Sequence, residues 1–368
     1  MAKSRLHELS EHGVSVWIDS LSREMLETGA LARLMEEDAV VGVTSNPTIF
    51  QKALSTGEWY DEQLQEVVKT EEDPTEIFLR LAIEDIKEAC DLMRSVWDRG
   101  KGLDGYVSLE VDPTLAYDRE STFEQAQRLK ADVDRPNLLV KIPATRPGLG
   151  AIEDSIAKGK SINITLIFSL ERYKAVVEAY LRGLERLVAE GGDPAPVASV
   201  ASFFVSRVDT EADKRLEAAG NSELQGKLAI ANAKLAYQHY LEAFSGPRWE
   251  VLAAKGATKQ RCLWASTSTK DPEYRDVMYI EELIGPDTVN TMPAETVVAF
   301  QDHGEIKRDS LTSDVEEAEQ LLVSLREAGI DYDDVTDTLE REGVQKFADS
   351  FEELLDGIRT KRSELATA

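Results

Sequence analysis

The sequence has 368 residues, of which 42% are hydrophobic and 30% are charged, an ordinary composition for a globular protein. Its 42 basic and 69 acidic side chains give a net charge of 42 − 69 = −27, which argues against nucleic acid or an anionic membrane surface as a partner. A negatively charged ligand would therefore depend on a local cluster of cations.

The two cysteines, Cys90 and Cys262, lie in apolar stretches without CxxC spacing, which suits a reducing cytoplasm rather than a disulfide framework. The chain opens without the pattern of a signal peptide, and no apolar run reaches the length of a membrane span. We therefore expect a soluble cytoplasmic protein. The sequence leaves the oligomeric state open.

Short β-branched runs predict eight strands, in chain order 14–20, 40–46, 105–111, 137–143, 162–168, 197–205, 262–267 and 287–293. Helical stretches separate them. Asp73 and Pro74 begin one helix, and Ser169 begins another that stops at Gly191 and Gly192. Strands that alternate with helices pair in parallel through right-handed crossovers, so eight such units favour the α/β class and a closed (β/α)8 TIM barrel.

The segment 312–368 is helical and highly charged, and Ser313 with Glu316 forms a predicted capping box at its start. We expect this segment to pack as extra C-terminal helices over the outside or the rim of the barrel. No low-complexity linker and no repeat of fixed period divides the chain. A single domain, 1–368, is therefore expected.

Polar residues share one parity on the predicted strands, and side chains of one parity point into a barrel. The polar parity carries Trp17 with Asp19, Thr44 with Asn46, Ser108 with Glu110, Lys141, Asn163 with Thr165, and Ser202 with Phe204. These residues stand toward the C-terminal ends of their strands, where barrel enzymes place their chemistry. Thr44, Ser108 or Thr165 alone would be interpreted as filling a layer. A lysine and two carboxylates favour a function, because interior charge needs a reason.

Lys141 lies inside an apolar strand, where an unpaired ammonium group would be costly. A lysine in a pocket of low dielectric loses its proton more easily, and the neutral amine attacks ketones to form a Schiff base. Protonated, that Schiff base is an electron sink for cleaving or forming the adjacent carbon–carbon bond. Asp19 and Glu110 are suited to acid–base roles, and Ser202 with Arg207 is suited to anchoring a phosphate.

The sequence lacks the motifs that other kinds of catalysis require. The four histidines show no metal-ligand spacing, and the chain contains neither HExxH nor GxSxG. GLG at 148–150 lacks the third glycine of a dinucleotide fingerprint, and GKS at 159–161 follows Asp154 where a P-loop needs glycine. The sequence therefore indicates neither a metal nor a nucleotide cofactor.

Five motifs, VTSNPTIF, VSLEVDP, LLVKIPAT, INITLIFS and SFFVSRVD, together resemble the transaldolase family, in order and at compatible spacing over nearly the whole chain. LWASTSTKDP and the acidic C-terminal region look like the branch found in actinobacteria and plants. The resemblance implies a (β/α)8 barrel and a class I Schiff-base aldolase of the non-oxidative pentose phosphate pathway, or pentose shunt, with no cofactor. Such transferases move a dihydroxyacetone unit from sedoheptulose 7-phosphate to glyceraldehyde 3-phosphate, giving erythrose 4-phosphate and fructose 6-phosphate.

The resemblance implies catalytic roles for four residues. Lys141 in LLVKIPAT matches the Schiff-base lysine. Asp19 in WIDS matches the acid–base group that handles the substrate hydroxyl during carbon–carbon cleavage. Glu110 in SLEVD and Thr165 in NITLIF match the pair that positions a catalytic water for Schiff-base formation and hydrolysis.

The resemblance also implies a site for sugar phosphates. Asn46 in TSNP and Asn163 in INITL match amides that hold substrate hydroxyls. Ser202 and Arg207 in SFFVSRVD match the phosphate site, and Phe204 matches a wall of the pocket.

One position departs from the family pattern. Better-known bacterial relatives carry a second phosphate-binding arginine in an ASFRN segment, where this chain reads ASTSTKDP. Lys270 in that segment is either a substitute for the arginine or an exposed loop lysine. A lysine is a point charge and does not reproduce a bidentate guanidinium.

Two other functions are weighed beside the transferase. One is a Schiff-base fructose-6-phosphate aldolase, a lyase that releases the three-carbon unit instead of passing it on. The other is a non-catalytic barrel that only binds sugar phosphates. Pure binding has no need of the lysine, and the complete set speaks against it: Asp19, Glu110, Lys141, Asn163 and Thr165.

Overall fold

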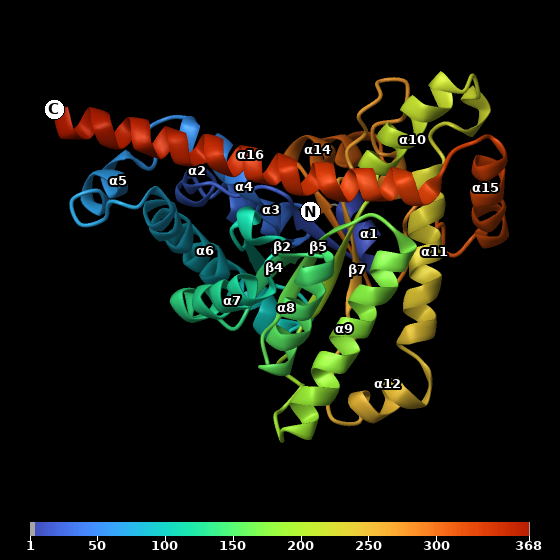
Figure 1. Ribbon diagram of the computed structural model, residues 1–368, viewed down its shortest axis with the longest axis horizontal. Coiled ribbons are helices and arrows are strands. Elements are labelled where there is room, and N and C mark those ends of the chain that lie inside the picture. Colours follow the sequence, from blue (N-terminus) through green and yellow to red (C-terminus); the bar gives the residue numbers. More distant parts are fainter. Residues whose placement is uncertain (1–3, 368) are drawn as a thin grey trace.

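The computed structural model describes residues 4–367, and in this part of the chain eight parallel strands pair in sequence order and close into a barrel (Figure 1). The strands are β1 Val14–Ile18, β2 Val40–Val43, β3 Tyr106–Glu110, β4 Leu138–Pro143, β5 Ile162–Ile167, β6 Ser199–Phe204, β7 Arg261–Ala265 and β8 Thr288–Met292. The predicted α/β class and (β/α)8 TIM barrel are confirmed. Residues 1–3 and 368 of the expected domain lie outside the described residues.

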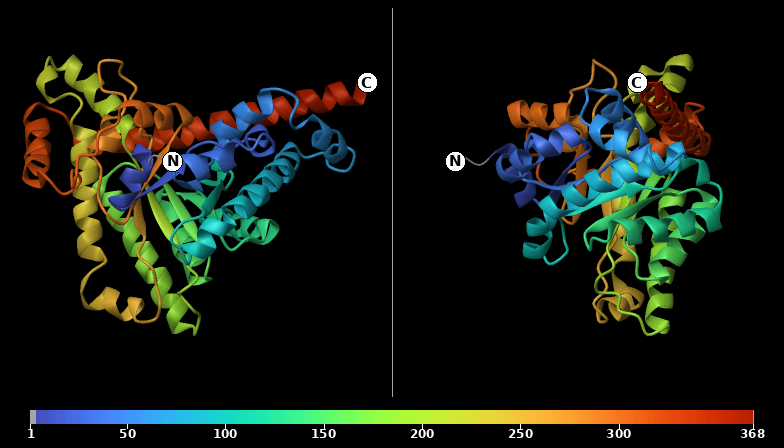
Figure 2. Two further views of the ribbon diagram at one scale, coloured as in Figure 1. Left: turned by 180° about the vertical axis from the view of Figure 1, so that it is seen from behind. Right: turned by 90° about the vertical axis from the view of Figure 1, so that its left-hand side faces the viewer.

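Helices surround the barrel, as two further views show (Figure 2). Those described are α1 Arg5–Glu11, α2 Arg23–Glu27, α3 Ala30–Glu37, α4 Pro47–Ser55, α5 Asp61–Val67, α6 Pro74–Arg99, α7 Arg119–Val133, α8 Arg146–Ala157, α9 Leu170–Ala189, α10 Ser206–Ala218, α11 Leu228–Ala243, α12 Gly246–Ala253, α13 Met278–Glu281, α14 Ala294–His303, α15 Val315–Glu327 and α16 Tyr332–Thr367, with 3-10 turns η1 Pro113–Leu115 and η2 Ser222–Leu224. Within residues 4–367, none of them combines the length and apolarity that crossing a membrane requires.

The predicted helix starts at residues 73 and 169 are confirmed by their caps. The Asp73 side chain accepts a hydrogen bond from the Thr75 amide at 2.8 Å. The Ser169 hydroxyl accepts one from the Arg172 amide at 3.0 Å. Each bond satisfies an amide that has no partner inside its helix, so these residues fix where α6 and α9 begin.

The predicted capping box at Ser313 is wrong. The Ser313 hydroxyl donates to the carbonyl of Ser310 at 3.1 Å, within the preceding turn. Asp314 stands before α15 with φ +55°, a left-handed conformation, and makes no side-chain cap. A capping serine needs extended backbone that aims its oxygen at the first helical amides, and the turn denies Ser313 that geometry.

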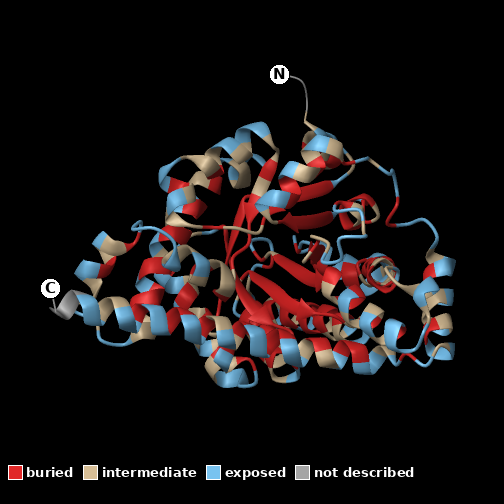
Figure 3. Ribbon diagram, turned by 90° about the horizontal axis from the view of Figure 1, so that it is seen from above, coloured by how far each residue is buried: buried red, intermediate tan, exposed pale blue. Residues whose placement is uncertain are grey.

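The barrel interior and the layer beneath the helices are both densely buried (Figure 3). Val16 and Ile18 of β1 are fully buried in the hydrophobic core. Trp17 has the opposite parity and packs against Gly42 of β2, where a β-carbon would lie 2.4 Å from the indole ring. The glycine thus leaves room for the indole, whose Nε1 donates to the Asp104 carboxylate at 3.1 Å.

The C-terminal helices α15 and α16 pack against other helices and, at one point, against a barrel strand. Helix α15 packs against α11, whereas α16, in red, crosses the barrel and packs against α4, α6 and the end of β5 (Figures 1 and 2). Phe351 of α16 meets Phe78 of α6 edge to face, with ring centroids 5.7 Å apart. Gly343 lets the helix approach closely, since a β-carbon there would lie 3.1 Å from the Leu166 side chain. The shared core supports one domain, which stays a prediction.

A buried carboxyl group beside the barrel gives a testable effect on stability. Asp209 of α10 accepts hydrogen bonds from the Ala229 amide at 2.7 Å and from the Tyr279 hydroxyl at 2.8 Å. Burial nevertheless raises the pKa of Asp209 to about 7. The native state therefore keeps a proton that the unfolded chain loses near pH 4, so this group makes stability fall as pH rises between those values.

The Asp209→Asn variant, which cannot ionise, is expected to gain stability relative to the wild type by about 1.4 kcal/mol per pH unit across this window. Urea unfolding of both proteins at several pH values between 4 and 8 measures the difference. Two curves that stay parallel throughout would show that Asp209 ionises at its ordinary pKa.

Candidate active site

A cavity of about 220 Å³ opens at the C-terminal ends of the strands. Most of the predicted site residues line it, namely Asp19, Asn46, Lys141, Thr165, Ser202, Phe204, Arg207 and Lys270. Glu110 and Asn163 contact these residues from outside the lining. The structure therefore brings together all the side chains that the sequence predicts for the site.

Lys141 lies at the centre of this site. Strand register places it beside Glu110 of β3 on one side and Asn163 of β5 on the other. Its Nζ donates a hydrogen bond to the Ser45 carbonyl at 3.1 Å and lies 3.3 Å from Oε2 of Glu110. The lysine side chain is 5% exposed, so its amine faces the cavity with little access to bulk water.

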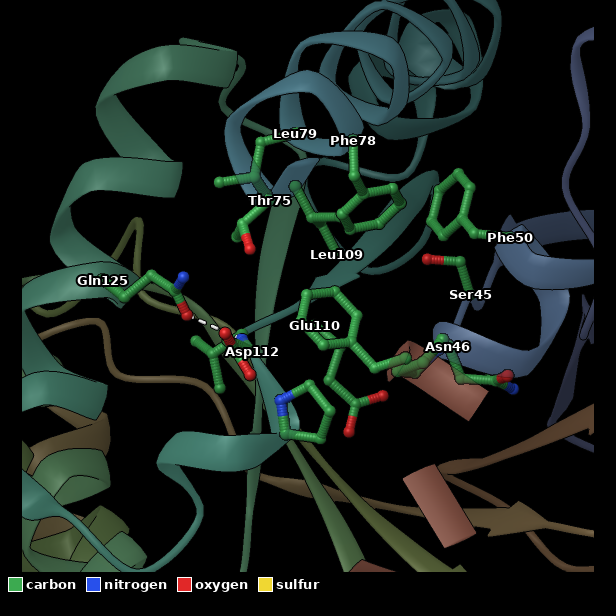
Figure 4. Close-up of a pocket in the computed structure, with 14 residues that line it drawn as sticks. Ser45, Asn46, Phe50, Thr75, Phe78, Leu79, Leu109, Glu110, Asp112 and Gln125 are labelled. Atoms are coloured by element: carbon green, nitrogen blue, oxygen red, sulfur yellow. Dashed lines mark hydrogen bonds between the residues drawn. The ribbon is translucent and has the colours of Figure 1, made fainter. Parts of the chain in front are cut away.

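Glu110 is the buried acidic neighbour of this amine. Its Oε2 atom lies within ion-pair distance of Lys141 but forms no hydrogen bond with another described residue. Phe50, Phe78 and Leu109 gather in a small cavity beside the glutamate (Figure 4). This burial raises the pKa of the Glu110 carboxyl, although the nearby ammonium group opposes the rise. A carboxyl group with a raised pKa holds its proton more readily, so the residue is suited to act as a proton donor.

Asp19 lies just after β1, on the cavity wall. Its Oδ1 accepts a hydrogen bond from the Thr44 hydroxyl at 2.6 Å, and that hydroxyl also lies 2.7 Å from the Thr291 hydroxyl. Burial raises the pKa of Asp19, and Lys141 is the strongest of the groups that lower it. The two carboxyls therefore stand in different hydrogen-bond environments beside one amine, which allows them different proton-transfer roles.

The two predicted asparagines are held in different ways. Asn163 donates to the Ser108 hydroxyl at 3.0 Å and accepts from the Ser202 hydroxyl at 2.7 Å, so its amide links β3, β5 and β6. Asn46 caps α4, and its Oδ1 accepts from the Ile49 amide at 3.0 Å. The cap occupies the side-chain oxygen of Asn46 and leaves its NH2 group available to donate, and the residue lines the cavity.

Thr165 is buried, and its Oγ1 finds no hydrogen-bond partner among the described residues. The next residue, Leu166, has φ +59°, and the pairing of β5 with β6 shifts register between Ile164 and Ile167. Such irregularities re-aim side chains beside active sites. An unpaired buried hydroxyl at this place fits the predicted role of holding a water.

The predicted phosphate anchor, Arg207, lies at the N-terminal end of α10. Its guanidinium stacks over the ring of Phe204, with Cζ 4.9 Å from the ring centroid. Among the described residues it forms no ion pair with a carboxylate. Lys270 is exposed at the same cavity and donates to the Ser268 hydroxyl at 2.6 Å. Of these two cations, Arg207 lies on a helix and Lys270 lies on a loop.

The cavity-lining residues that sequence reasoning missed include Thr291, Glu295, Lys346 and Phe347. Thr291 lies on β8 and shares the polar parity of its neighbours, so alternation along that strand was a usable signal. The other three belong to helices α14 and α16, where an amphipathic pattern gives no sign of which residues reach the barrel mouth. In residues 4–367, no cluster of histidine, cysteine and acidic side chains has the arrangement of a metal site.

The fold and the site together define a (β/α)8 barrel with a buried lysine, suited to carbonyl chemistry, at its C-terminal mouth. The family model described as "Transaldolase/Fructose-6-phosphate aldolase" matches residues 16–358. The chain is 52% identical over 356 residues to the transaldolase of Frankia alni, covering 96% of each chain. It is 54% identical over 357 residues to that of Saccharopolyspora erythraea, covering 97% of each.

The chain therefore belongs to the transaldolase/fructose-6-phosphate aldolase family, and the predicted resemblance is confirmed. A third relative, the transaldolase of a Parafrankia strain, is 53% identical over 365 residues, which is 98% of this chain and 99% of the relative. With three such relatives matched over almost their full length, the chain is a transferase of the transaldolase type.

Proposed function

We propose that this enzyme transfers a dihydroxyacetone unit from sedoheptulose 7-phosphate to glyceraldehyde 3-phosphate through a Schiff base on Lys141. Erythrose 4-phosphate and fructose 6-phosphate are the products. The observation that carries the proposal is the buried Lys141 amine, 3.3 Å from a carboxyl whose pKa burial raises, at the mouth of the barrel. A buried amine at this place is useful to a catalyst. A protein that only binds sugar phosphates would bear the desolvation cost of the amine without using it.

The first half of the proposed reaction forms the Schiff base. The neutral amine of Lys141 adds to the ketose carbonyl, and the resulting carbinolamine loses its oxygen as water. Glu110 supplies the proton that this departing oxygen needs, through a water held with Thr165. The raised pKa of Glu110 and the unpaired Thr165 hydroxyl support these roles.

The second half breaks and remakes the carbon–carbon bond. Asp19 takes the proton from the substrate hydroxyl as the bond breaks, the electron pair passes to the iminium nitrogen, and the first aldehyde leaves. The enamine then attacks the second aldehyde, and Asp19 returns the proton to the new hydroxyl. Water hydrolyses the Schiff base and restores Lys141. The position of Asp19 on the cavity wall, bonded to Thr44, supports this assignment.

Trapping with borohydride tests the proposal. The enzyme is incubated with fructose 6-phosphate, reduced with borohydride, digested and mapped by mass spectrometry. We expect a three-carbon adduct on Lys141, since reduction makes the Schiff base permanent. Reduction without sugar is the control. An adduct on another lysine, or no adduct at all, would overturn the proposed mechanism.

The family description also covers fructose-6-phosphate aldolases, which release the three-carbon unit. Acceptor dependence separates the two reactions. We expect fructose 6-phosphate to be consumed continuously only when erythrose 4-phosphate is present. Steady release of dihydroxyacetone without any acceptor would instead identify a lyase.

Arg207 is proposed to bind the substrate phosphate, supported by its unpaired guanidinium at the cavity. The Arg207→Ala variant is expected to raise KM for fructose 6-phosphate by about 10- to 100-fold, because a charge-assisted contact remote from the reacting bond supplies binding energy. Steady-state kinetics with the acceptor saturating measures this change. An unchanged KM would place the phosphate elsewhere.

A cytoplasmic location is also proposed. Cys90 and Cys262 are both buried free thiols, which supports a reducing compartment. Sugar phosphates are the proposed partners, and the oligomeric state stays open.

A further inference from the structure

Helix α16 contributes two neighbouring side chains, Lys346 and Phe347, to the active-site cavity. Phe347 is buried, and its ring centroid lies 5.8 Å from Lys141 Nζ and 5.8 Å from Arg207 Cζ. The ring is therefore close to both the reactive amine and the proposed phosphate anchor. Lys346, the residue before Phe347, is exposed and lines the same cavity.

Among the described residues, the cations Arg207 and Lys346 form no ion pair with a carboxylate. Repulsion from Arg207 is the main cause that lowers the pKa of Lys346, so the two positive groups lie close together. Among the described residues, Lys346 forms no hydrogen bond and no ion pair. Two carboxyl groups line the cavity, Asp19 and Glu295, and Asp19 acts on Arg207 from across it. In the part of the chain that the structure describes, neither carboxyl group lies within ion-pair distance of Arg207 or Lys346. Two unpaired cations held near each other form a site for a divalent anion.

A solvated lysine on a helix surface is the simplest alternative. The same helix shows how such a lysine is accommodated, since the Lys361 Nζ lies 2.6 Å from the Asp61 carboxylate. Lys346 has no such partner, although the protein carries a net charge of −27 and offers an excess of carboxylates. A lysine that stays unpaired beside an arginine in a strongly acidic protein indicates a ligand that supplies the negative charge.

We propose that Lys346 of α16 binds the substrate phosphate together with Arg207 and thereby supplies the second cation of the phosphate site. This inference rests on the proposed function. It assigns to the C-terminal helix a direct part in substrate specificity, and it makes Lys346, rather than Lys270, the second phosphate ligand. The start of α10 at Ser206 adds the positive end of a helix dipole near Arg207.

The Lys346→Met variant tests the proposal, with Lys361→Met as the control on the same helix. We expect Lys346→Met to raise KM for fructose 6-phosphate by about 10-fold or more, with kcat little changed. With unphosphorylated fructose as the donor, kcat/KM should equal that of the wild type. An equal loss with both sugars would show that Lys346 only supports the fold, and no loss with either would show that it is a surface lysine.

Binding of inorganic phosphate separates this inference from the proposed function. Calorimetric titration at constant ionic strength needs no turnover and no Schiff base. We expect phosphate to bind about 10-fold more weakly to Lys346→Met than to the wild type, and equally to the wild type and Lys361→Met. Trapping at Lys141 could fail while Lys346→Met still bound phosphate more weakly than the wild type. That result would support the phosphate site and contradict the proposed reaction. Identical phosphate affinities in all three proteins would overturn the role of Lys346.

Discussion

The Lys141→Met variant is expected to lose turnover by a factor on the order of 10⁴ or more while it keeps its fold. Methionine is an unbranched side chain of similar length, and it fits a position that is 5% exposed without leaving a cavity. It has no nucleophilic nitrogen, so no Schiff base can form. A coupled assay for glyceraldehyde 3-phosphate measures the activity, and circular dichroism with thermal unfolding checks the fold.

Lys234→Met is a matched control for this variant. The Lys234 side chain is 6% exposed, and its ammonium lies 3.8 Å from the Asp314 carboxylate, away from the cavity. We expect this second buried lysine to be replaceable with little change in kcat. Turnover by Lys141→Met at a rate near that of Lys234→Met would show that the reaction does not use the Lys141 amine.

The Asp19→Asn variant is expected to lower kcat by about 10²- to 10⁴-fold and to leave KM nearly unchanged. An amide keeps the hydrogen bond with Thr44 but cannot take a proton from the substrate hydroxyl. Schiff-base formation should survive, because Lys141 and Glu110 remain. Borohydride trapping with fructose 6-phosphate should then label Lys141 with the whole six-carbon sugar phosphate instead of a three-carbon unit.

The two masses make the roles of Lys141 and Asp19 distinguishable in one experiment. A three-carbon adduct formed at the wild-type rate in Asp19→Asn would show that another group takes the proton. The pH profile gives an independent check, because the cleavage step needs ionised Asp19. Since burial raises the pKa of this carboxyl, activity is expected to fall on acidification at a pH above the ordinary range for aspartate.

Much of the fold follows from alternation along the strands. A β-branched strand with a charge at one parity, such as Leu138–Pro143, has few places in a soluble fold other than a barrel wall with a polar mouth. The closed order of strands was therefore predictable. The alignment of Glu110, Lys141 and Asn163 in one layer was not predictable from the sequence. It depends on the register between strands, which is set by the packing of the whole barrel.

The contribution of α16 to the active-site cavity could not be predicted from the sequence, for a different reason. Lys346 and Phe347 lie in a long charged helix. In such a helix, the sequence pattern predicts that a phenylalanine belongs to the buried apolar face and that a lysine belongs to the solvated face. Which turn of that helix meets the mouth depends on tertiary packing, including the close approach at Gly343. The failed capping box at Ser313 has a similar origin, since the preceding turn overrides the local signal.

The position of α16 has a consequence for how the enzyme is made. All eight strands and the Lys141 amine emerge from the ribosome before Phe347 and Lys346 are synthesised. If the barrel closes before α16 is made, the Lys141 amine is expected to lie in a cavity that lacks the side formed by Lys346 and Phe347. Binding of sugar phosphates is therefore expected to begin only when α16 has been made and has packed onto the barrel, and a chain that ends before α16 is expected to be inactive.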